Sequence, residues 1–232
     1  KPLFKRFDGY IPSRDESDKK KCIVLIPVGI PGMGKTTFFT ALKKILKEKN
    51  VAVSSISSDD VRKEILDKIY QANPDYDRER AFEKSTKPAK EEFFKRVKDA
   101  IWATSSLEQD AHIVILDKNH PPGILPDSIA YFKDQEFSDV FHMKIVVVFP
   151  HIVEPYRGVK HNYPLSVNFL LTCINRGIGR DEHQTLVGDK YHIARVILGF
   201  FGGYKNFKAN DESFKHLGAQ YVMRIPFTYE EE

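Results

Sequence analysis

The chain has 232 residues, of which 41% are hydrophobic and 29% are charged, so it can bury a core and is unlike a disordered segment. Its 36 basic and 32 acidic residues leave a net charge of +4, which is compatible with a polyanionic partner without establishing one. With only two cysteines, Cys22 and Cys173, and no apolar run near the about 18 residues of a membrane helix, we expect no disulfides and no membrane insertion.

The first twenty residues combine prolines, a glycine and a charged run, and we interpret residues 1–20 as a linker or N-terminal arm. Beyond it, continuously apolar runs alternate with amphipathic helical patterns, which indicates a parallel sheet covered on both faces. We therefore expect one α/β domain over residues 21–232. Its predicted strands are 22–28, 51–56, 112–116, 144–149 and a last, edge strand at 219–225; its predicted helices are 36–49, 60–72, 88–104, 165–174 and 191–200.

The segment 29–36 reads Gly-Ile-Pro-Gly-Met-Gly-Lys-Thr, a pattern typical of a phosphate-binding loop. It lies between a predicted strand and a predicted helix, where glycines let backbone N–H groups surround phosphate oxygens and the helix start favours the same anion. Lys35 would bridge the outer phosphates, and Thr36 would help hold Mg²⁺. The alternative is a glycine turn without a ligand. The predicted nucleotide-binding residues of the loop are Gly29, Pro31, Gly32, Met33, Gly34, Lys35, Thr36 and Thr37.

Asp59 and Arg62 follow the second predicted strand, at an end of the sheet that should face the phosphate loop. They are spaced i, i+3 and so share one face of a helical turn. A carboxylate beside a guanidinium suits a kinase acceptor site, where one accepts the hydroxyl proton and the other holds an anionic group. Asp60 is the rival for the base. The alternative for the pair is an N-cap aspartate beside a solvated arginine.

Asp117 ends a predicted buried strand and is expected to support the metal and Thr36 from a second shell. Asn119 and His120 follow it and could contact the acceptor, although a histidine before two prolines is also typical of a simple turn. The basic stretch 84–98, interleaved with Phe93 and Phe94, could track a nucleic-acid backbone or form an ordinary solvated face.

Arg176 and Arg180 follow a predicted helix and have two glycines between them. This pattern predicts a mobile cationic lid that would close over the donor phosphates and neutralise charge during phosphoryl transfer. The alternative is a glycine helix cap with surface arginines.

These motifs, in this order, resemble the polynucleotide 5′-kinase family. The wider sequence is similar to the kinase domains of fungal tRNA ligases, and the resemblance covers roughly residues 20–228. Where phage-type kinases of the family have a threonine, this chain has Lys118, and no Asn-Lys-x-Asp motif is present to read guanine. The resemblance rests on the segments 26–38, 58–64, 116–122, 160–165 and 176–186, and on Arg157.

The resemblance implies a P-loop NTPase-type three-layer α/β fold with a mainly parallel sheet and an arginine lid. It implies an RNA 5′-hydroxyl kinase that uses GTP (or ATP) and Mg²⁺, with Asp59 as general base and Lys35 and Arg176 also catalytic. The acceptor would be the 5′-OH end of the tRNA 3′ half during tRNA splicing, with Arg62 holding its phosphate. The implied setting is intracellular, nuclear and/or cytoplasmic, in a longer protein with ligase and cyclic phosphodiesterase modules.

Two other functions fit the same motifs. A small-molecule or nucleoside monophosphate kinase would share the phosphate loop and the arginines but would need a closed acceptor pocket. A non-catalytic, nucleotide-gated RNA-binding module would leave Asp59 and the lid without a role.

Overall fold

The computed structural model describes residues 19–133, 135–151, 165–179, 188–208 and 210–227. Most of the predicted arm, Arg157, the segment 160–164 and Arg180 lie outside these residues. The strands are β1 (Lys21–Pro27), β2 (Ala52–Ser57), β3 (Ala111–Asp117), β4 (His142–His151) and β5 (Tyr221–Pro226). The helices are α2 (Lys35–Glu48), α3 (Ser58–Ala72), α4 (Arg78–Ala103), α5 (Leu125–Phe132), α6 (Gln135–Ser138), α7 (Val167–Ile178), α8 (Lys190–Gly202) and α9 (Asp211–His216), with a short 3₁₀ turn at Thr104–Ser106.

The five strands form one sheet in the order β2-β3-β1-β4-β5, and every neighbouring pair is parallel. The predicted α/β P-loop fold with a parallel sheet is thereby confirmed, and β5 lies at an edge as expected. β1 is central, and all seven of its residues are buried, which explains why it reads as a continuous apolar run. The carboxyl ends of parallel strands meet at one edge, so the segments that follow β1, β2 and β3 converge there.

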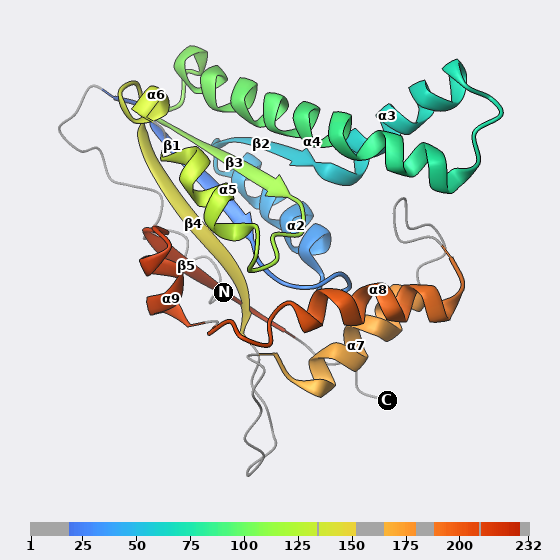
Figure 1. Cartoon of the computed structure of the whole chain (residues 1–232). Helices are drawn as coiled ribbons and strands as arrows, with labels where there is room; N and C mark the ends of the chain where they lie inside the picture. The colour runs from blue at the N-terminus through green and yellow to red at the C-terminus, as the bar shows by residue number, and fades with distance from the viewer. Residues whose placement is uncertain (1–18, 134, 152–164, 180–187, 209, 228–232) are drawn as a thin grey trace, which may run out of the picture.

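Helices cover the sheet on both faces, and Figure 1 shows α2 and α5 on opposite sides of the strands. On one face, Phe39, Leu42 and Leu46 of α2 pack against alternate residues of β1, β3 and β4. On the other face, side chains of α4, α5, α7, α8 and α9 pack against the remaining residues of these strands. Successive residues of a strand point to opposite faces of the sheet, so alternate residues pack against the helices of one face and of the other.

Helix α4 begins at Arg78, ten residues before the predicted start at Pro88. Asp77 caps it, accepting a hydrogen bond from the Arg80 backbone N–H at 2.8 Å. Pro88 lies inside the helix at an exposed position, where water can solvate the carbonyl group that proline leaves without a donor. Packing of a buried stripe against the core stabilises the helix on both sides of Pro88. The stripe consists of Ala81, Ser85, Ala89, Phe93, Val97 and Ile101.

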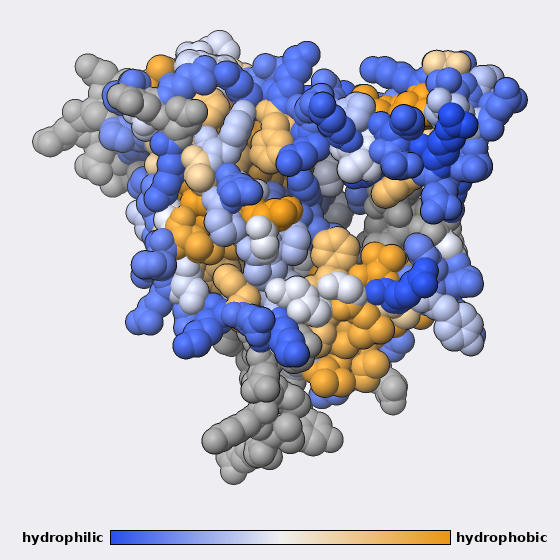
Figure 2. Space-filling view, viewed as in Figure 1, coloured by the Kyte–Doolittle hydropathy of each residue, from blue (hydrophilic) through white to orange (hydrophobic). Residues whose placement is uncertain are grey.

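Helices α5, α6 and α9 were not predicted, because they are short, with eight, four and six residues respectively. Both cysteines are buried free thiols, and burial raises the pKa of Cys22 to about 12. Among the described helices, none is both long enough and apolar enough to span a bilayer. Apolar side chains gather over α7 and α8 on the face seen in Figure 2; the exposed ones on these helices are Val167, Leu171, Ile178, Tyr191 and Leu198.

Candidate functional site

The phosphate-loop segment joins the buried end of β1 to the first turn of α2. Gly34 is the N-cap of α2 with φ 90°, and Gly32 has φ 84°, a region that residues with a side chain rarely adopt. Pro31, Gly32 and Met33 are buried, whereas Thr36 and Thr37 are exposed at the helix start. The local structure is therefore the glycine-rich strand-to-helix turn that binds phosphate groups with backbone N–H groups.

Helix α7 packs directly on this loop. A Cβ atom added to Gly32 would overlap the backbone carbonyl oxygen of Cys173, so the two backbones touch. From the sequence, the glycines of the loop are expected because they let backbone N–H groups surround phosphate oxygens. The structure adds a second reason for a glycine there, which is the close approach of another helix.

Lys35, Thr36 and Asp117 lie together at the ends of β1 and β3. The Lys35 ammonium group donates to the Ile30 carbonyl oxygen of its own loop at 3.2 Å. Burial raises the pKa of Asp117, and this effect is opposed by the positive charge of Lys35 and by a hydrogen bond from Thr36. Asp117 therefore faces the phosphate-loop lysine and threonine across the sheet edge, as expected of a strand-end carboxylate.

The residues present fit Mg²⁺. A hydroxyl and a carboxylate are hard oxygen donors, and Mg²⁺ is usually held by one or two protein oxygens together with substrate phosphates and water. Thr36 would supply the oxygen that contacts the ion, and Asp117 would orient Thr36 and the water around it. The described residues contain no cluster of three or more His, Cys, Asp or Glu side chains, so no all-protein metal cage is present within that part of the chain.

The first turn of α3 brings Asp59 and Arg62 to the same place. Ser57 is in register with Asp117 on the neighbouring strand, and α3 begins with the next residue. Ser57 itself caps α3, accepting from the Asp60 backbone N–H at 3.2 Å, so the cap is not Asp59. Asp59 is half-buried, whereas Asp60 is exposed. Asp59 is close enough to both Asp117 and Arg62 for its negative charge to raise the pKa of each.

Arg62 is held against α4. Its Nη1 donates to Ser85 Oγ at 3.4 Å and to Thr86 Oγ1 at 3.5 Å, and its guanidinium carbon lies 4.6 Å from the centre of the Phe82 ring. Burial lowers the pKa of Arg62, and Asp59 partly offsets this effect. An arginine that is fixed by neutral partners keeps its charge available for an anionic ligand.

His120 does not lie where an acceptor ligand could reach it. Its side chain is fully buried, and its Nδ1 is 3.1 Å from the Pro27 carbonyl oxygen, so it supports the end of β1 from behind the phosphate loop. Burial lowers the pKa of His120 to about 3, and the nearby charge of Lys118 adds to this effect. The neighbouring Asn119 is half-buried, with its Oδ1 buried away from solvent. The acceptor contact expected for His120 is therefore corrected to a supporting position.

Arg176 lies in the last turn of α7, one turn after Cys173, and is half-buried. Its guanidinium carbon is 4.9 Å from the centre of the Phe227 ring, which follows β5. The partner arginine, Arg180, and most of the predicted lid lie outside the described residues.

Sequence analysis missed three supporting contacts. The fully buried Tyr204 lies near the backbone of Gly29, and burial raises the pKa of its hydroxyl. Phe82 supports Arg62, and Lys118 lies on Phe93 and Phe94. Only Lys118 carried a signal in the sequence, because it stands where phage-type polynucleotide kinases have a threonine.

The fold and the loop together define an α/β P-loop protein. No protein-family profile and no curated protein sequence matches the chain. Among solved structures, a fungal RNA kinase is 16% identical, with 92% of this chain and 78% of that chain covered and a TM-score of 0.49. A deoxyadenosine kinase from M. mycoides, solved with bound dATP, is 13% identical, with 88% of this chain and 90% of that chain covered and a TM-score of 0.34. Neither similarity is high enough to assign a function, which has to follow from the site.

Proposed function

We propose that this chain is an RNA 5′-hydroxyl kinase that transfers the γ-phosphoryl group of GTP, or of ATP, to the 5′-OH end of a cleaved tRNA half during splicing. The observation that carries the proposal is the convergence of Asp59 with Asp117 and the phosphate-loop residues Lys35 and Thr36. A half-buried carboxylate next to a phosphate loop, with an arginine three residues later, has the chemistry of an acceptor site for a hydroxyl group.

The proposed reaction divides among these residues. Asp59 accepts the proton as the 5′-oxygen attacks the γ-phosphorus, and the bond from that phosphorus to the bridging oxygen breaks to release the nucleoside diphosphate. Lys35 neutralises charge on the transferred group, and so do Arg176, in the last turn of α7, and Arg180. Mg²⁺, when bound by Thr36 with Asp117 behind it, supplies further charge stabilisation. The transition state is loose, so positioning and electrostatics account for most of the catalysis.

The wider setting belongs to the same proposal. Residues 21–232 would form the kinase domain of a protein of the fungal tRNA ligase type, linked to ligase and cyclic phosphodiesterase modules, and acting in the nucleus and/or cytoplasm. Arg62 would bind the acceptor phosphate, and Asn119 would be a further acceptor contact, whereas His120 is fully buried.

Phosphate transfer tests the proposal directly. The chain is incubated with Mg²⁺ and γ-labelled GTP or ATP, and the acceptors are a 5′-OH oligoribonucleotide, the same strand with a 5′-phosphate, and a panel of nucleosides and nucleoside monophosphates. We expect label on the 5′-OH strand and none on the blocked strand. Transfer to nucleosides alone would establish a small-molecule kinase. Tight RNA binding without any transfer would establish a non-catalytic module.

A further inference from the structure

A second stripe of side chains runs along α4 beside the buried one. It consists of Phe82, Thr86, Lys90 and Phe94, spaced four residues apart and therefore on one side of the helix. Thr86 and Phe82 contact Arg62, and Phe94 contacts Lys118, so the stripe joins these two cations along the side of the candidate acceptor site.

Lys118 is held at the other end of this stripe. Its ammonium nitrogen lies 5.2 Å from the centre of the Phe93 ring and 5.3 Å from that of Phe94, both within the range of cation–π attraction. The backbone bends directly after β3, because the Lys118 N–H donates to the Leu116 carbonyl oxygen at 2.8 Å. As a result Asp117 faces the phosphate loop while Lys118 lies against α4.

The charges near Lys118 are positive. Burial lowers the pKa of Lys118, and the charges of Lys90 and Arg62 lower it further. Within the described part of the chain, neither Lys90 nor Lys118 forms an ion pair with a carboxylate. Cations that repel one another at a fixed distance are stabilised when an anion binds among them.

The other cations of the basic stretch 84–98 are arranged differently. Three of the six cations in the stretch are paired with carboxylates, and these three form an ordinary salt-bridged face. The pairs are Lys87 with Glu91 at 3.9 Å, Arg96 with Glu92 at 2.8 Å and with Glu64, and Lys98 with Glu136 at 3.0 Å. Lys90 differs because it stands in the stripe that leads to the acceptor site.

We propose that Lys118 and Lys90, next to Arg62, bind phosphate groups of a single-stranded nucleic-acid acceptor that lie on the 3′ side of its reacting 5′-OH. These contacts would make the chain select such an acceptor over a free nucleoside. This inference rests on the proposed function, since it takes Asp59 as the position of the reacting hydroxyl. Lys118 and Lys90 are placed on the α4 side of Asp59, whereas the donor phosphates are placed on the opposite side, at Lys35.

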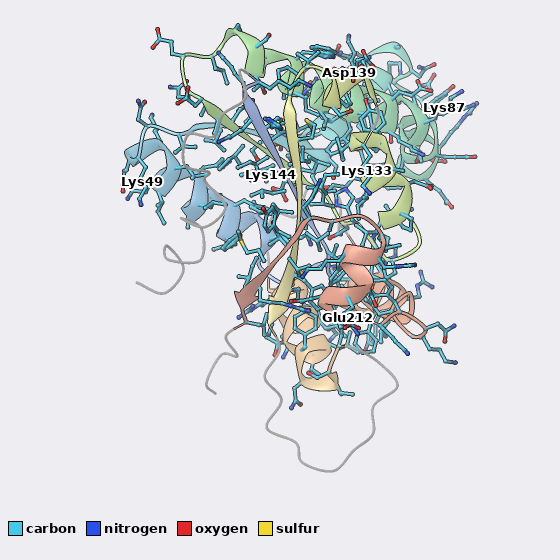
Figure 3. All side chains as sticks on the ribbon, turned by 90° about the vertical axis from the view of Figure 1, so that its left-hand side faces the viewer. Lys49, Lys87, Lys133, Asp139, Lys144 and Glu212 are labelled. Carbon is cyan, nitrogen blue, oxygen red and sulfur yellow. The ribbon has the colours of Figure 1, made fainter. Side chains whose placement is uncertain are left out.

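Binding of a 3′-labelled, 5′-OH oligoribonucleotide over a series of salt concentrations tests this inference without requiring catalysis. Affinity for a single strand falls with salt, and each lost phosphate contact makes the negative slope of log affinity against log salt shallower by about 0.7. We expect this drop for Lys118→Gln and for Lys90→Gln, and a wild-type slope for Lys118→Arg. Lys87→Gln is the matched control, because Figure 3 shows Lys87 on the outside of α4. Since Lys90 is exposed, its variant remains informative if Lys118→Gln folds poorly.

A kinetic comparison identifies the ligand. The kcat/KM for a nucleoside 3′-phosphate, divided by that for the nucleoside, should fall about tenfold or more in Lys118→Gln, the loss of one charge-assisted contact. Unchanged salt slopes in both variants with normal transfer would overturn this inference alone. Lower slopes without transfer in the wild type would uphold phosphate binding at Lys118 and Lys90 but overturn its role in acceptor selection together with the kinase. An equal drop for Lys87→Gln, or a loss confined to the KM of the donor, would also overturn it.

Discussion

The backbone of Gly32 lies against the backbone carbonyl of Cys173, which couples the phosphate loop to helix α7. Arg176 is one helical turn beyond Cys173 on the same helix. The contact therefore brings the helix that carries Arg176 to the phosphate loop, although the two come from distant parts of the chain.

Because of this contact, two glycines of the loop should differ in how much a substitution by alanine destabilises the fold. Gly32 and Gly34 have φ of 84° and 90°, so an alanine at either carries about 1–2 kcal/mol of backbone strain. Only at Gly32 would the new methyl group also meet neighbouring backbone, since nothing lies within 4 Å at Gly34. We expect Gly32→Ala to lower the free energy of unfolding by about 1–3 kcal/mol more than Gly34→Ala in chemical denaturation. Equal decreases in the free energy of unfolding would show that α7 can move away from the added methyl group without a loss of stability.

Asp59 and Asp60 form a natural pair of variants. Asp59 is half-buried close to Asp117, whereas Asp60 is exposed, and the proposed function assigns the base to Asp59. Asp59→Asn should keep donor affinity and lose about 100- to 10,000-fold in turnover, while Asp60→Asn stays near wild type. Single-turnover transfer and equilibrium donor binding measure the two quantities. The reverse ranking would move the base to Asp60.

Arg62 should act on the acceptor. It is fixed by Ser85, Thr86 and Phe82, away from the phosphate loop. Arg62→Ala should therefore raise the KM for RNA more than the KM for the donor, by a loss of about 1.5–3 kcal/mol. Steady-state kinetics with each substrate varied in turn gives both values. A larger change in the donor KM would assign Arg62 to the donor site.

Arg176 should act in the transition state. Arg176→Ala is expected to lower kcat by roughly 1,000-fold with a smaller effect on donor KM, and Arg176→Lys should restore little, because lysine lacks the planar fork. Arg195→Ala is the control, as Arg195 is exposed on the neighbouring helix α8. Near-normal kcat in Arg176→Ala would remove this residue from the proposed chemistry.

His120 predicts a pH dependence of stability. Burial lowers its pKa from 6.5 to about 3, so below about pH 6 the unfolded chain binds a proton that the folded chain does not. Wild-type stability should therefore fall as pH drops from about 6 towards 4, more steeply than that of His120→Gln. The difference in slope approaches 1.4 kcal/mol per pH unit for one proton. Urea denaturation across this range measures it, and parallel curves would mean that His120 becomes charged within the folded protein.

The central strands were predictable because parallel strands buried on both faces appear as unbroken apolar runs. β1 and β3 differ from their predicted ranges by one residue at each end. The predicted start of α4 was wrong because Pro88 has the local features of a helix start. The buried stripe continues on both sides of Pro88, and it becomes evident only when the residues before and after the proline are read as one helix.

The site was predictable where a local pattern determines it. The phosphate loop, the strand-end Asp117 and the first turn of α3 follow from spacing and from the geometry of parallel sheets. The burial of His120 was not predictable, because it goes with a contact to the Pro27 carbonyl at the end of β1, 93 residues away in the chain. The contact of Gly32 with Cys173 and the position of Lys118 against α4 likewise arise from tertiary packing that no local motif records.

The strand order places the two parts of the candidate site on strands that differ in how many neighbours they have. The phosphate loop follows β1, which is hydrogen-bonded on both sides, whereas the acceptor residues follow β2, which pairs only with β3 in the described sheet. Amide groups of an outer strand exchange with solvent through smaller openings than those of a central one. Under the proposed function, the acceptor side would loosen to admit or release a strand while the nucleotide side stays folded, so the two ligands would not have to leave together.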